Sequence, residues 1–437
     1  MKKIIALALA LLLLCACVTG CGKTEENPSA NNSSNANGET AEPVEIVMWH
    51  TLTDHHQEAL NKIVDAFNAS QNDYVVVAEQ QPYSEYNAKL LQAVSTGSGP
   101  DFVSMYPSDA INYINEGYLY DMTDLISDPE TGIADFKEQL VEGTYAEVTQ
   151  WDNGKIYMMP VTACSEVLFY NKTMFDALNL SEPTTWEELE NCAKAIYEAY
   201  GIAGFGTDSV TDTFQGWMVQ KGSDYIDVDA KEIAIDREIA IETLEWFANA
   251  IEAGHFRLVG EDYFFSNPFG SQAVGMYIGS AAGIDYVYAA IPEGEGSFEL
   301  GCCPIPQAGV KDYIASWGTT YVCLSNDESH ARGVLEFYKF MSQKDTLIDW
   351  AIACGTLPAR KEAVEDARIQ AYAETNIAVK ALVEEYERIG YLPSVVGAAT
   401  VRTEIDKMVQ TVALGTVDAE TAFDSFTAAC NAALQEG

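Results

Sequence analysis

The feature that most constrains the fold is a regular alternation of strand-like and helix-like segments after residue 44. Residues 44–49 (VEIVMW) and 74–78 (YVVVA) are rich in β-branched and apolar side chains, and each precedes a segment with apolar residues at helical spacing. A third strand is predicted at residues 101–105, after the turn-forming sequence GSGP at residues 97–100. Strands that alternate with helices build a parallel sheet covered on both faces, so the sequence predicts an α/β protein.

The pattern changes near residues 154–172, where two extended apolar segments flank a polar middle. We interpret this change as a crossing into a second lobe. Further helices are predicted at residues 186–200, opened by Thr184 or Thr185, at residues 239–253, ended by Gly254, and at residues 330–341. The chain after residue 43 is long enough and apolar enough for about two globular domains.

The N-terminus has the layout of an export signal. Lys2 and Lys3 precede an apolar run at residues 4–18, which is too short for a spanning helix and is soon followed by polar residues. The tetrad VTGC at residues 18–21 resembles the bacterial lipobox, with LCAC at residues 14–17 as a weaker match; the alternative is an ordinary secretory signal cut beside a chance cysteine. We expect a signal peptide at residues 1–21, acylation of Cys21, and a place on the outer face of the cell membrane.

Composition excludes several partners. Residues 22–43 contain almost nothing apolar and are predicted to form a flexible tether. The chain has 24 basic and 66 acidic residues, a formal charge of −42, and loses Lys2 and Lys3 with the signal. Such a surface repels nucleic acid and anionic lipid headgroups, so no nucleic-acid partner is expected. The cysteines after Cys21 are odd in number and lack zinc-site spacing, so most are predicted to be buried apolar side chains.

Signals for catalysis are weak. The sequence contains no GxSxG, P-loop or Rossmann fingerprint, and with 66 acidic residues a pair of carboxylates carries no information. His50, His55 and His56 lie near Asp54, but adjacent histidines project from different faces of a helix and HExxH is absent. We expect no enzyme activity, no metal and no cofactor. The alternatives are a secreted carbohydrate-active hydrolase, or an adhesin or sensor-presenting protein without a transporter.

Four segments rich in aromatic and hydroxyl side chains are predicted as loops where open α/β sheets bind ligands. Tryptophan faces pack on the C–H side of sugar rings, and neutral polar groups and carboxylates bind the hydroxyls. Each of these tryptophans has a core position as its alternative, and Trp186, Trp246 and Trp350 are predicted to pack inside helical regions. The four loops are residues 49–51 (WHT), 106–109 (YPSD), 215–217 (QGW) and 316–319 (SWGT).

Five sequence motifs carry a family resemblance over residues 44–437. They are VMWH at residues 47–50, GSGPDFV at 97–103, VLFYNK at 167–172, PTTWEEL at 183–189 and GTLPAR at 355–360. With these motifs the chain resembles the extracellular solute-binding proteins of ABC importers, in the group that contains maltodextrin-binding and glycerol-phosphate-binding proteins.

The resemblance implies a two-lobed periplasmic-binding-protein type II fold, maltodextrin-binding-like, with a hinge and an interlobe cleft. The lobes close over the ligand and no covalent chemistry is required. The implied N-terminal lobe is residues 44–164 plus 302–342, and the C-terminal lobe is residues 165–301 plus 343–437. The implied partners are a carbohydrate ligand and ABC permease transmembrane subunits, with the protein itself a monomer.

The chain is most similar to the glycerol-3-phosphate binders, through Trp49-His50 and the segment VRTEID at residues 401–406. The resemblance implies that Arg402 grips a phosphate, with an exposed ion pair as its alternative role. It also implies that Tyr86 contacts ligand and that Ser280 lies in the far lobe. The chain departs from the family at two binding positions, Pro107 and Thr356, which favours a sugar or oligosaccharide over glycerol phosphate itself.

The predicted function is that of a lipid-anchored substrate-binding protein of an ABC importer, which captures a sugar, oligosaccharide or glycerol-phosphate-type polyol. Asp109 is included among the site residues because its carboxylate could replace the one lost at Pro107. The predicted ligand-binding residues are Trp49, His50, Thr51, Tyr86, Tyr106, Ser108, Asp109, Ser165, Trp217, Gly279, Ser280, Trp317, Gly318, Thr356 and Arg402.

Overall fold

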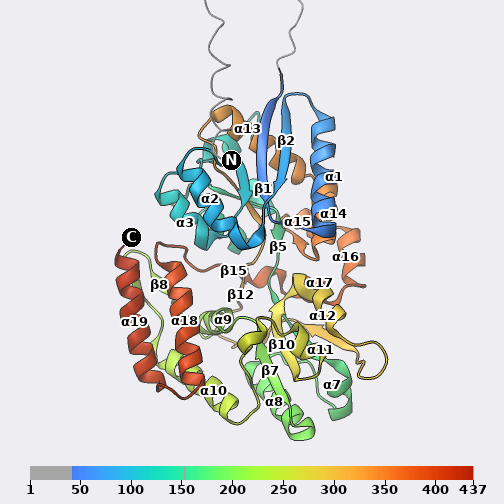
Figure 1. Ribbon diagram of the computed structural model, residues 1–437, viewed down its shortest axis with the longest axis vertical. Helices are drawn as coiled ribbons and strands as arrows, with labels where there is room; N and C mark the ends of the chain where they lie inside the picture. Colours follow the sequence, from blue (N-terminus) through green and yellow to red (C-terminus); the bar gives the residue numbers. More distant parts are fainter. Residues whose placement is uncertain (1–41, 152–153, 437) are drawn as a thin grey trace, which may run out of the picture. The chain divides into compact units, whose positions relative to one another are not determined.

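The computed structural model describes residues 42–151 and 154–436. The predicted signal peptide, Cys21 and nearly all of the predicted tether lie outside the described residues. Two separate mixed sheets, each with helices packed around it, organise the body from residue 43 onward (Figure 1). None of the helices in this part of the chain combines the length and the apolar character needed to cross a bilayer.

The first sheet has five strands in the order β2-β1-β3-β13-β4. Its parallel part consists of β1 paired with β2 and with β3, which confirms the three strands predicted from the alternating pattern. Strand β13 comes from a distant part of the sequence and runs antiparallel to both β3 and β4. The strands are β1 (Val44–His50), β2 (Tyr74–Gln80), β3 (Phe102–Ser104), β4 (Met158–Pro160) and β13 (Thr320–Cys323).

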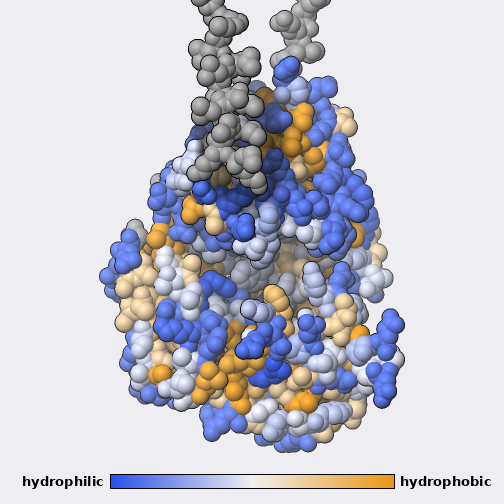
Figure 2. Space-filling view, in the orientation of Figure 1, coloured by the Kyte–Doolittle hydropathy of each residue, from blue (hydrophilic) through white to orange (hydrophobic). Residues whose placement is uncertain are grey.

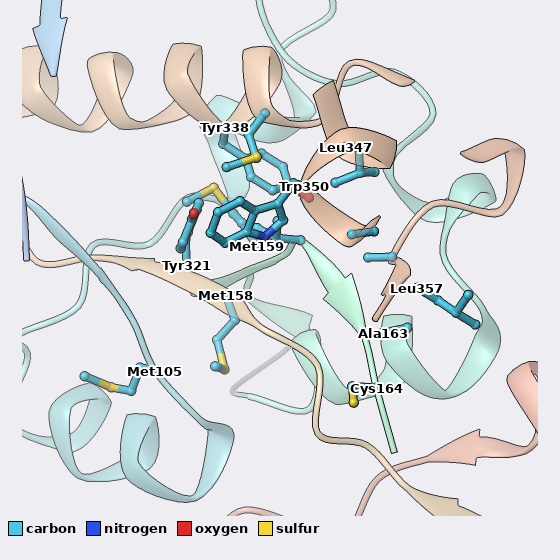
Figure 3. Packing of buried hydrophobic residues seen from close by; sticks show 14 of the residues in the cluster. Met105, Met158, Met159, Ala163, Cys164, Tyr321, Tyr338, Leu347, Trp350 and Leu357 are labelled. Carbon is cyan, nitrogen blue, oxygen red and sulfur yellow. The ribbon is translucent and has the colours of Figure 1, made fainter. Parts of the chain in front are cut away.

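Helix α1 (Asp54–Ser70) covers the first sheet with the apolar face predicted from its spacing, which includes Leu60 and Phe67. The Phe67 ring meets the edge of Phe337 in α13 (Glu328–Met341), with ring centroids 5.3 Å apart. Figure 3 shows the Trp350 ring beside Met159 within this core, and Trp350 is only 3% exposed, as predicted. The other helices near this sheet are α2 (Tyr86–Ser95), α3 (Pro107–Asn115), α4 (Thr123–Ser127), α5 (Phe136–Gln139) and α6 (Glu142–Val148).

The second sheet has four strands in the order β11-β6-β10-β7. Strand β6 lies between β11 and β10 and runs antiparallel to both, whereas β10 and β7 are parallel. Every residue of β6 is buried, because helices and neighbouring strands cover it on all sides. The strands are β6 (Glu166–Asn171), β7 (Ala203–Thr207), β10 (Val274–Ser280) and β11 (Leu300–Cys303), and a separate pair is formed by β8 (Ile226–Asp227) and β9 (Glu232–Ile233).

The helices around the second sheet bury a cluster of tryptophans. Helix α8 (Trp186–Tyr200) begins with a capping box between Thr185 and Glu188, which confirms the predicted helix and its start. The contacts of Trp186 and Trp246 agree with their predicted packing roles, since the two rings meet edge to face with centroids 6.5 Å apart. The remaining helices are α7 (Lys172–Leu178), α9 (Val210–Gln220), α10 (Arg237–Glu252), α11 (Ser266–Gly270), α12 (Ile284–Ala290), and the neighbouring pair α18 (Ala398–Ala413) and α19 (Ala419–Gln435), drawn in red in Figure 1.

Polar side chains dominate the exposed surface. In the view of Figure 2, hydrophilic residues cover most of the face and hydrophobic residues form small separate groups, as the excess of acidic residues suggests. All seven cysteines of the described residues are free thiols, and five of them are buried, which confirms that most serve as apolar side chains.

Two crossing segments link strands of the first sheet to strands of the second. The first lies between β4 and β6, at residues 161–165, and the second between β11 and β13, at residues 304–319. Helix α14 contacts α1 beside the first sheet, while α17 contacts β11 of the second, so residues 344–385 reach both sheets. The lobe boundaries given above stay predictions. The elements at the crossings are β5 (Thr162–Ala163) paired with β14 (Leu357–Pro358), β12 (Ile314–Ala315) paired with β15 (Ile389–Gly390), and α14 (Lys344–Cys354), α15 (Lys361–Val364), α16 (Ala367–Ala373) and α17 (Ile377–Glu385).

One buried carboxyl group joins both crossing segments. Glu385, at the end of α17, is fully buried. Its Oε1 accepts a hydrogen bond from the Ser165 hydroxyl at 2.9 Å, and its Oε2 accepts one from the backbone N–H of Ile305 at 3.2 Å. Ser165 belongs to the first crossing and Ile305 to the second, so this side chain holds the two segments at a fixed spacing.

We expect replacement of Glu385 by alanine to lower the free energy of unfolding by about 1–3 kcal/mol, because two buried donors lose their acceptor. Urea denaturation of the Glu385→Ala variant measures this loss. Glu384→Ala is the matched control, since its side chain is exposed and adjacent in sequence. Equal stability of the two variants would contradict the joining role of Glu385.

Candidate ligand-binding site

A pocket lies between elements that belong to the two sheets. It is partly open and has an empty volume of about 590 Å³, including its opening to solvent. Helices α3 and α6 contribute from the side of the first sheet, α9 and α18 from the side of the second, and the second crossing segment contributes the region around Trp317. The polar and aromatic residues that line it are Tyr106, Ser108, Glu147, Asp212, Gln215, Tyr225, Tyr313, Ser316, Trp317, Tyr391, Ser394 and Arg402.

Two aromatic rings at one wall of the pocket come from different segments. Tyr106 immediately precedes α3, whose first residue is Pro107, and its side chain is 47% exposed. The Tyr106 ring meets the edge of Trp317, with centroids 5.4 Å apart and planes at 84°. The backbone N–H of Trp317 donates to the carbonyl of Cys164 at 2.8 Å, so the two crossing segments fix the position of this indole.

Arg402 reaches the pocket from the first turns of α18 and is held on three sides. Its Nη1 donates to Asp212 Oδ1 at 2.6 Å and to Gln215 Oε1 at 3.0 Å, and its guanidinium lies 5.1 Å from the centroid of the Trp317 ring. The Asp212 side chain is only 6% exposed, so this ion pair is shielded from water. The Arg402–Asp212 ion pair is therefore partly buried. An exposed ion pair was the alternative role considered for Arg402 from the sequence, and the observed pair differs from it in burial.

Glu147 places a second carboxyl group in the pocket. It sits in α6, is 6% exposed, and its Oε2 accepts a hydrogen bond from the Ser316 hydroxyl at 3.2 Å. Burial raises the pKa of Glu147 from its ordinary 4.5 to about 8, against a smaller lowering effect of the Ser316 hydrogen bond. At neutral pH this side chain is therefore mostly a neutral acid that can donate as well as accept.

Two further acidic residues lie near the end of β10, and one of them, Glu166, is close to Asp212. Glu166, the first residue of β6, pairs with Ser280 of β10, and burial together with the charges of Asp212 and Asp208 raises the pKa of Glu166 well above its ordinary value. Burial raises the pKa of Asp208 to about 6, although its Oδ1 accepts a hydrogen bond from the N–H of Phe265. This side of the pocket is therefore rich in carboxyl groups.

The structure brings together four of the residues predicted from the sequence: Tyr106, Ser108, Trp317 and Arg402 all line the pocket. Asp109 is the next residue after Ser108 in the first turn of α3, and its side chain is exposed. The binding roles of these five residues stay predictions.

Four other predicted residues lie close to the crossing segments and do not line the pocket. Ser165 is bonded to Glu385, and the Ser280 hydroxyl is 4.0 Å from the thiol of Cys164. At Gly279 an added Cβ would stand 2.5 Å from Asp208 Oδ2, and at Gly318 it would stand 2.1 Å from the carbonyl oxygen of Thr162. Both glycines therefore permit a close approach that a side chain would prevent.

The remaining predicted residues lie in packed surroundings outside the pocket lining. Trp49 is 8% exposed and its Nε1 donates to Glu79, while Tyr86 is half-buried on α2. His50 Nε2 and Thr356 Oγ1 are buried without a hydrogen-bond partner among the described residues, and half-buried Thr51 follows β1.

Three of the four loop predictions were wrong in whole or in part. Trp49 and His50 end β1, residues 107–109 form the first turn of α3, and residues 215–217 lie inside α9. Ser209 caps this helix by accepting from the N–H of Asp212, which starts a helix where aromatic and hydroxyl residues suggested a loop. Residues two apart on a helix point to nearly opposite sides. Gln215 therefore faces Arg402, while Trp217 stacks on Trp186 with centroids 4.8 Å apart, and its role in binding stays a prediction.

Sequence reasoning missed several residues that line the pocket, above all Glu147, Asp212 and Tyr313. The two acids could not be distinguished among 66 acidic residues. Tyr313 lies just before Trp317 in the second crossing segment, and its hydroxyl is buried without a partner among the described residues. In the sequence, the only signal for Tyr313 was its place in a polar segment beside Trp317, a predicted site residue.

The raised pKa of Glu147 predicts how stability depends on pH. Between its unfolded pKa near 4.5 and its folded pKa near 8, the folded protein keeps a proton that the unfolded chain has lost. The contribution of this group is therefore fully present below pH 4.5 and declines as pH rises toward 8. We expect the Glu147→Gln variant to show a smaller decline than the wild type between pH 5 and pH 8.

Chemical denaturation at a series of pH values measures this difference. Glu384→Gln serves as the control, because its side chain is exposed and does not line the pocket. Parallel pH profiles of the wild type and Glu147→Gln would contradict the assignment of a neutral acid at this position.

Comparisons with known proteins identify the family of this chain. The family model described as bacterial extracellular solute-binding protein matches residues 62–377, more than half of the chain. The sn-glycerol-3-phosphate-binding periplasmic protein UgpB of Brucella melitensis is 24% identical over 412 residues, which cover 89% of this chain and 93% of that protein.

Solved structures of similar proteins share the fold. The cyclic alpha-maltosyl-1,6-maltose binding protein from Arthrobacter globiformis has a TM-score of 0.79 at 22% identity, covering 90% of this chain and 100% of its own. UgpB from Mycobacterium tuberculosis, solved in complex with glycerophosphocholine, has a TM-score of 0.73 at 18% identity and covers 91% of this chain and 99% of its own. These similarities confirm the predicted two-lobed fold. With two sheets, a pocket between them and a family match over most of its length, the chain belongs to the bacterial extracellular solute-binding proteins.

Proposed function

We propose that this protein is the lipid-anchored receptor of an ABC importer and that it binds a hydroxyl-rich solute, a carbohydrate or a polyol, in the pocket around Trp317 and Arg402. The single observation that carries the proposal is the aromatic pair of Tyr106 and Trp317 in a pocket whose other lining residues include hydroxyl, amide and carboxyl groups. Aromatic faces pack on the C–H surfaces of a sugar ring, while the polar groups satisfy its hydroxyls.

The names of related proteins support this class of ligand. The curated relatives are sn-glycerol-3-phosphate-binding proteins, and the solved structures include a cyclic alpha-maltosyl-1,6-maltose binding protein and a sugar-binding protein MalE from Xanthomonas citri. Their ligands are polyol or sugar derivatives rich in hydroxyl groups. A pocket with several neutral hydroxyl side chains suits such ligands.

The position of the pocket supports delivery by lobe closure. Ser108 approaches from α3 beside the first sheet, and Arg402 from α18 beside the second. A ligand that touches both sides stabilises the closed arrangement by its difference in affinity for the closed and open states. A permease can then distinguish loaded from empty protein, and the ligand is released unchanged.

We expect replacement of Tyr106 by alanine to weaken binding of the best-bound sugar about tenfold or more, because the loss of an aromatic contact and its burial corresponds to at least ~1.4 kcal/mol. Isothermal titration with a panel of monosaccharides, maltose, maltotriose and sugar alcohols identifies the sugar and measures the change. Tyr286→Ala is the matched control, since Tyr286 is 74% exposed and does not line the pocket.

The same titrations discriminate between a receptor and a hydrolase. A receptor returns every sugar of the panel intact after prolonged incubation, which chromatography of the recovered ligand checks. No heat with any member of the panel would contradict the carbohydrate proposal, and cleaved products would favour a hydrolase.

We also propose that Cys21 carries the lipid anchor, on the basis of the sequence VTGC that ends the signal. The Cys21→Ala variant should be found in the medium instead of the membrane fraction, because it lacks the acylated residue. Fractionation of cells that express the chain, with mass spectrometry of the N-terminal peptide, measures this outcome.

Cys17→Ala is the control for the weaker lipobox match at residues 14–17. Its product should stay in the membrane fraction. Release of the Cys17→Ala protein, with retention of Cys21→Ala, would move the anchor to the earlier cysteine.

A further inference from the structure

One basic side chain lines the pocket, and a carboxylate is bonded to it. Among the described residues of the lining, Arg402 is the only basic one, Asp212 is its acidic partner, and Glu147 is mostly a neutral acid at neutral pH. Arg402 is therefore the only side chain here that could attract an anionic ligand group such as a phosphate.

The charge of Arg402 is already matched by a carboxylate inside the protein. Its Nη1 is shared between Asp212 at 2.6 Å and Gln215 at 3.0 Å, and its guanidinium carbon lies over the ring of Trp317, 5.1 Å from the centroid. Asp212 is 6% exposed, so water does not screen the pair strongly. A phosphate that approached Arg402 would have to compete with this carboxylate or sit beside it.

The surroundings of Asp212 add to this disadvantage. Burial and, after it, the nearby charges of Asp212 and Asp208 raise the pKa of Glu166, so these carboxyl groups lie close together. A phosphate dianion would bring two more negative charges to this side of the pocket, and burial of uncompensated charge is costly. No second basic residue lines the pocket to offset them.

The groups left free to bind ligand are neutral. Tyr313 lines the pocket, is 3% exposed, and its hydroxyl has no hydrogen-bond partner among the described residues. A buried hydroxyl without a partner is costly and needs a donor or acceptor from a ligand or from water. Ser108, Ser394 and Tyr391 add further hydroxyl groups to the same lining.

We propose that this pocket takes an uncharged, hydroxyl-rich solute and rejects phosphate esters, with Asp212 as the specificity-determining residue because its carboxylate pairs with the charge of Arg402. This inference rests on the proposed function of the pocket and narrows its ligand from sugars and polyol phosphates to uncharged sugars and polyols. It assigns roles to Asp212 and Tyr313, neither of which sequence reasoning identified.

The test titrates the full mature chain with three probes: the best-bound sugar of the panel, sn-glycerol 3-phosphate and inorganic phosphate. Wild-type protein should bind the sugar and give no saturable signal with either phosphate probe. The Asp212→Asn variant keeps a side chain of the same size but frees the charge of Arg402, so it should bind sn-glycerol 3-phosphate at least tenfold more tightly than the wild type.

Asp65→Asn is the control, because it removes one negative charge at an exposed position of α1, outside the pocket. It should leave phosphate binding unchanged. Thermal unfolding of each variant establishes that it is folded before titration. The comparison of sugar with phosphate probes on the wild-type protein tests the rejection of phosphate without any variant.

Each outcome bears on a different statement. Wild-type binding of sn-glycerol 3-phosphate as tight as that of any sugar would overturn the rejection of phosphate while leaving the proposed polyol receptor intact. A folded Asp212→Asn protein without any gain for phosphate would overturn the role of Asp212. Failure of the wild type to bind any sugar or phosphate probe would overturn the proposed function, and the inference with it.

Discussion

The whole arrangement depends on the two segments that link the strands of the two sheets and on the buried polar contacts that hold these segments together. The Ser165 hydroxyl and the N–H of Ile305 both donate to Glu385, which is completely buried. The N–H of Trp317 donates to Cys164, and Gly318 allows close contact with Thr162. Because these bonds fix the crossing segments, they also fix the indole of Trp317 that forms one wall of the pocket.

Buried charge near the crossings is handled in two different ways. Asp212 stays close to a positive guanidinium at 2.6 Å, which compensates for its removal from water. Glu147 and Glu385 have no basic residue bonded to them among the described residues, and burial raises the pKa of each to about 8. Those two groups avoid the cost of a buried charge by keeping their protons, and they become neutral hydrogen-bonding groups at physiological pH.

Local sequence patterns predicted the elements that depend on neighbours along the chain. The three parallel strands, the apolar face of α1 and the capping box at Thr185 all follow from spacing and residue type within one segment. Tyr106, Ser108 and Trp317 could be proposed for the site because aromatic and hydroxyl residues gather just after strands or between them. Arg402 was added by family resemblance, because one arginine on a helix has no local signal of function.

The rest could not be predicted because it arises from contacts between distant residues. Ser165 and Glu385 are 220 residues apart, and Asp212 and Arg402 are 190 residues apart. No periodic pattern reports such pairs, and the carboxylates involved do not differ locally from the other acidic residues. The error at residues 215–217 has a related cause. Gln215 faces the pocket, whereas Trp217 packs in the core on the opposite side of the same helix. A mixture of polar and aromatic residues of this kind resembles the sequence of a loop.

The same long-range contacts explain how ligand binding can be coupled to lobe closure. Trp317 touches Tyr106 from the first sheet's side and lies against Arg402 from the second, so one indole carried by a crossing segment meets both walls of the pocket. Under the proposed function, a ligand that packs on these rings and satisfies the Tyr313 hydroxyl gains contacts only when both walls are near. Its binding energy would then favour a closed state by that difference alone, and the Glu385 contacts would hold the two crossing segments together.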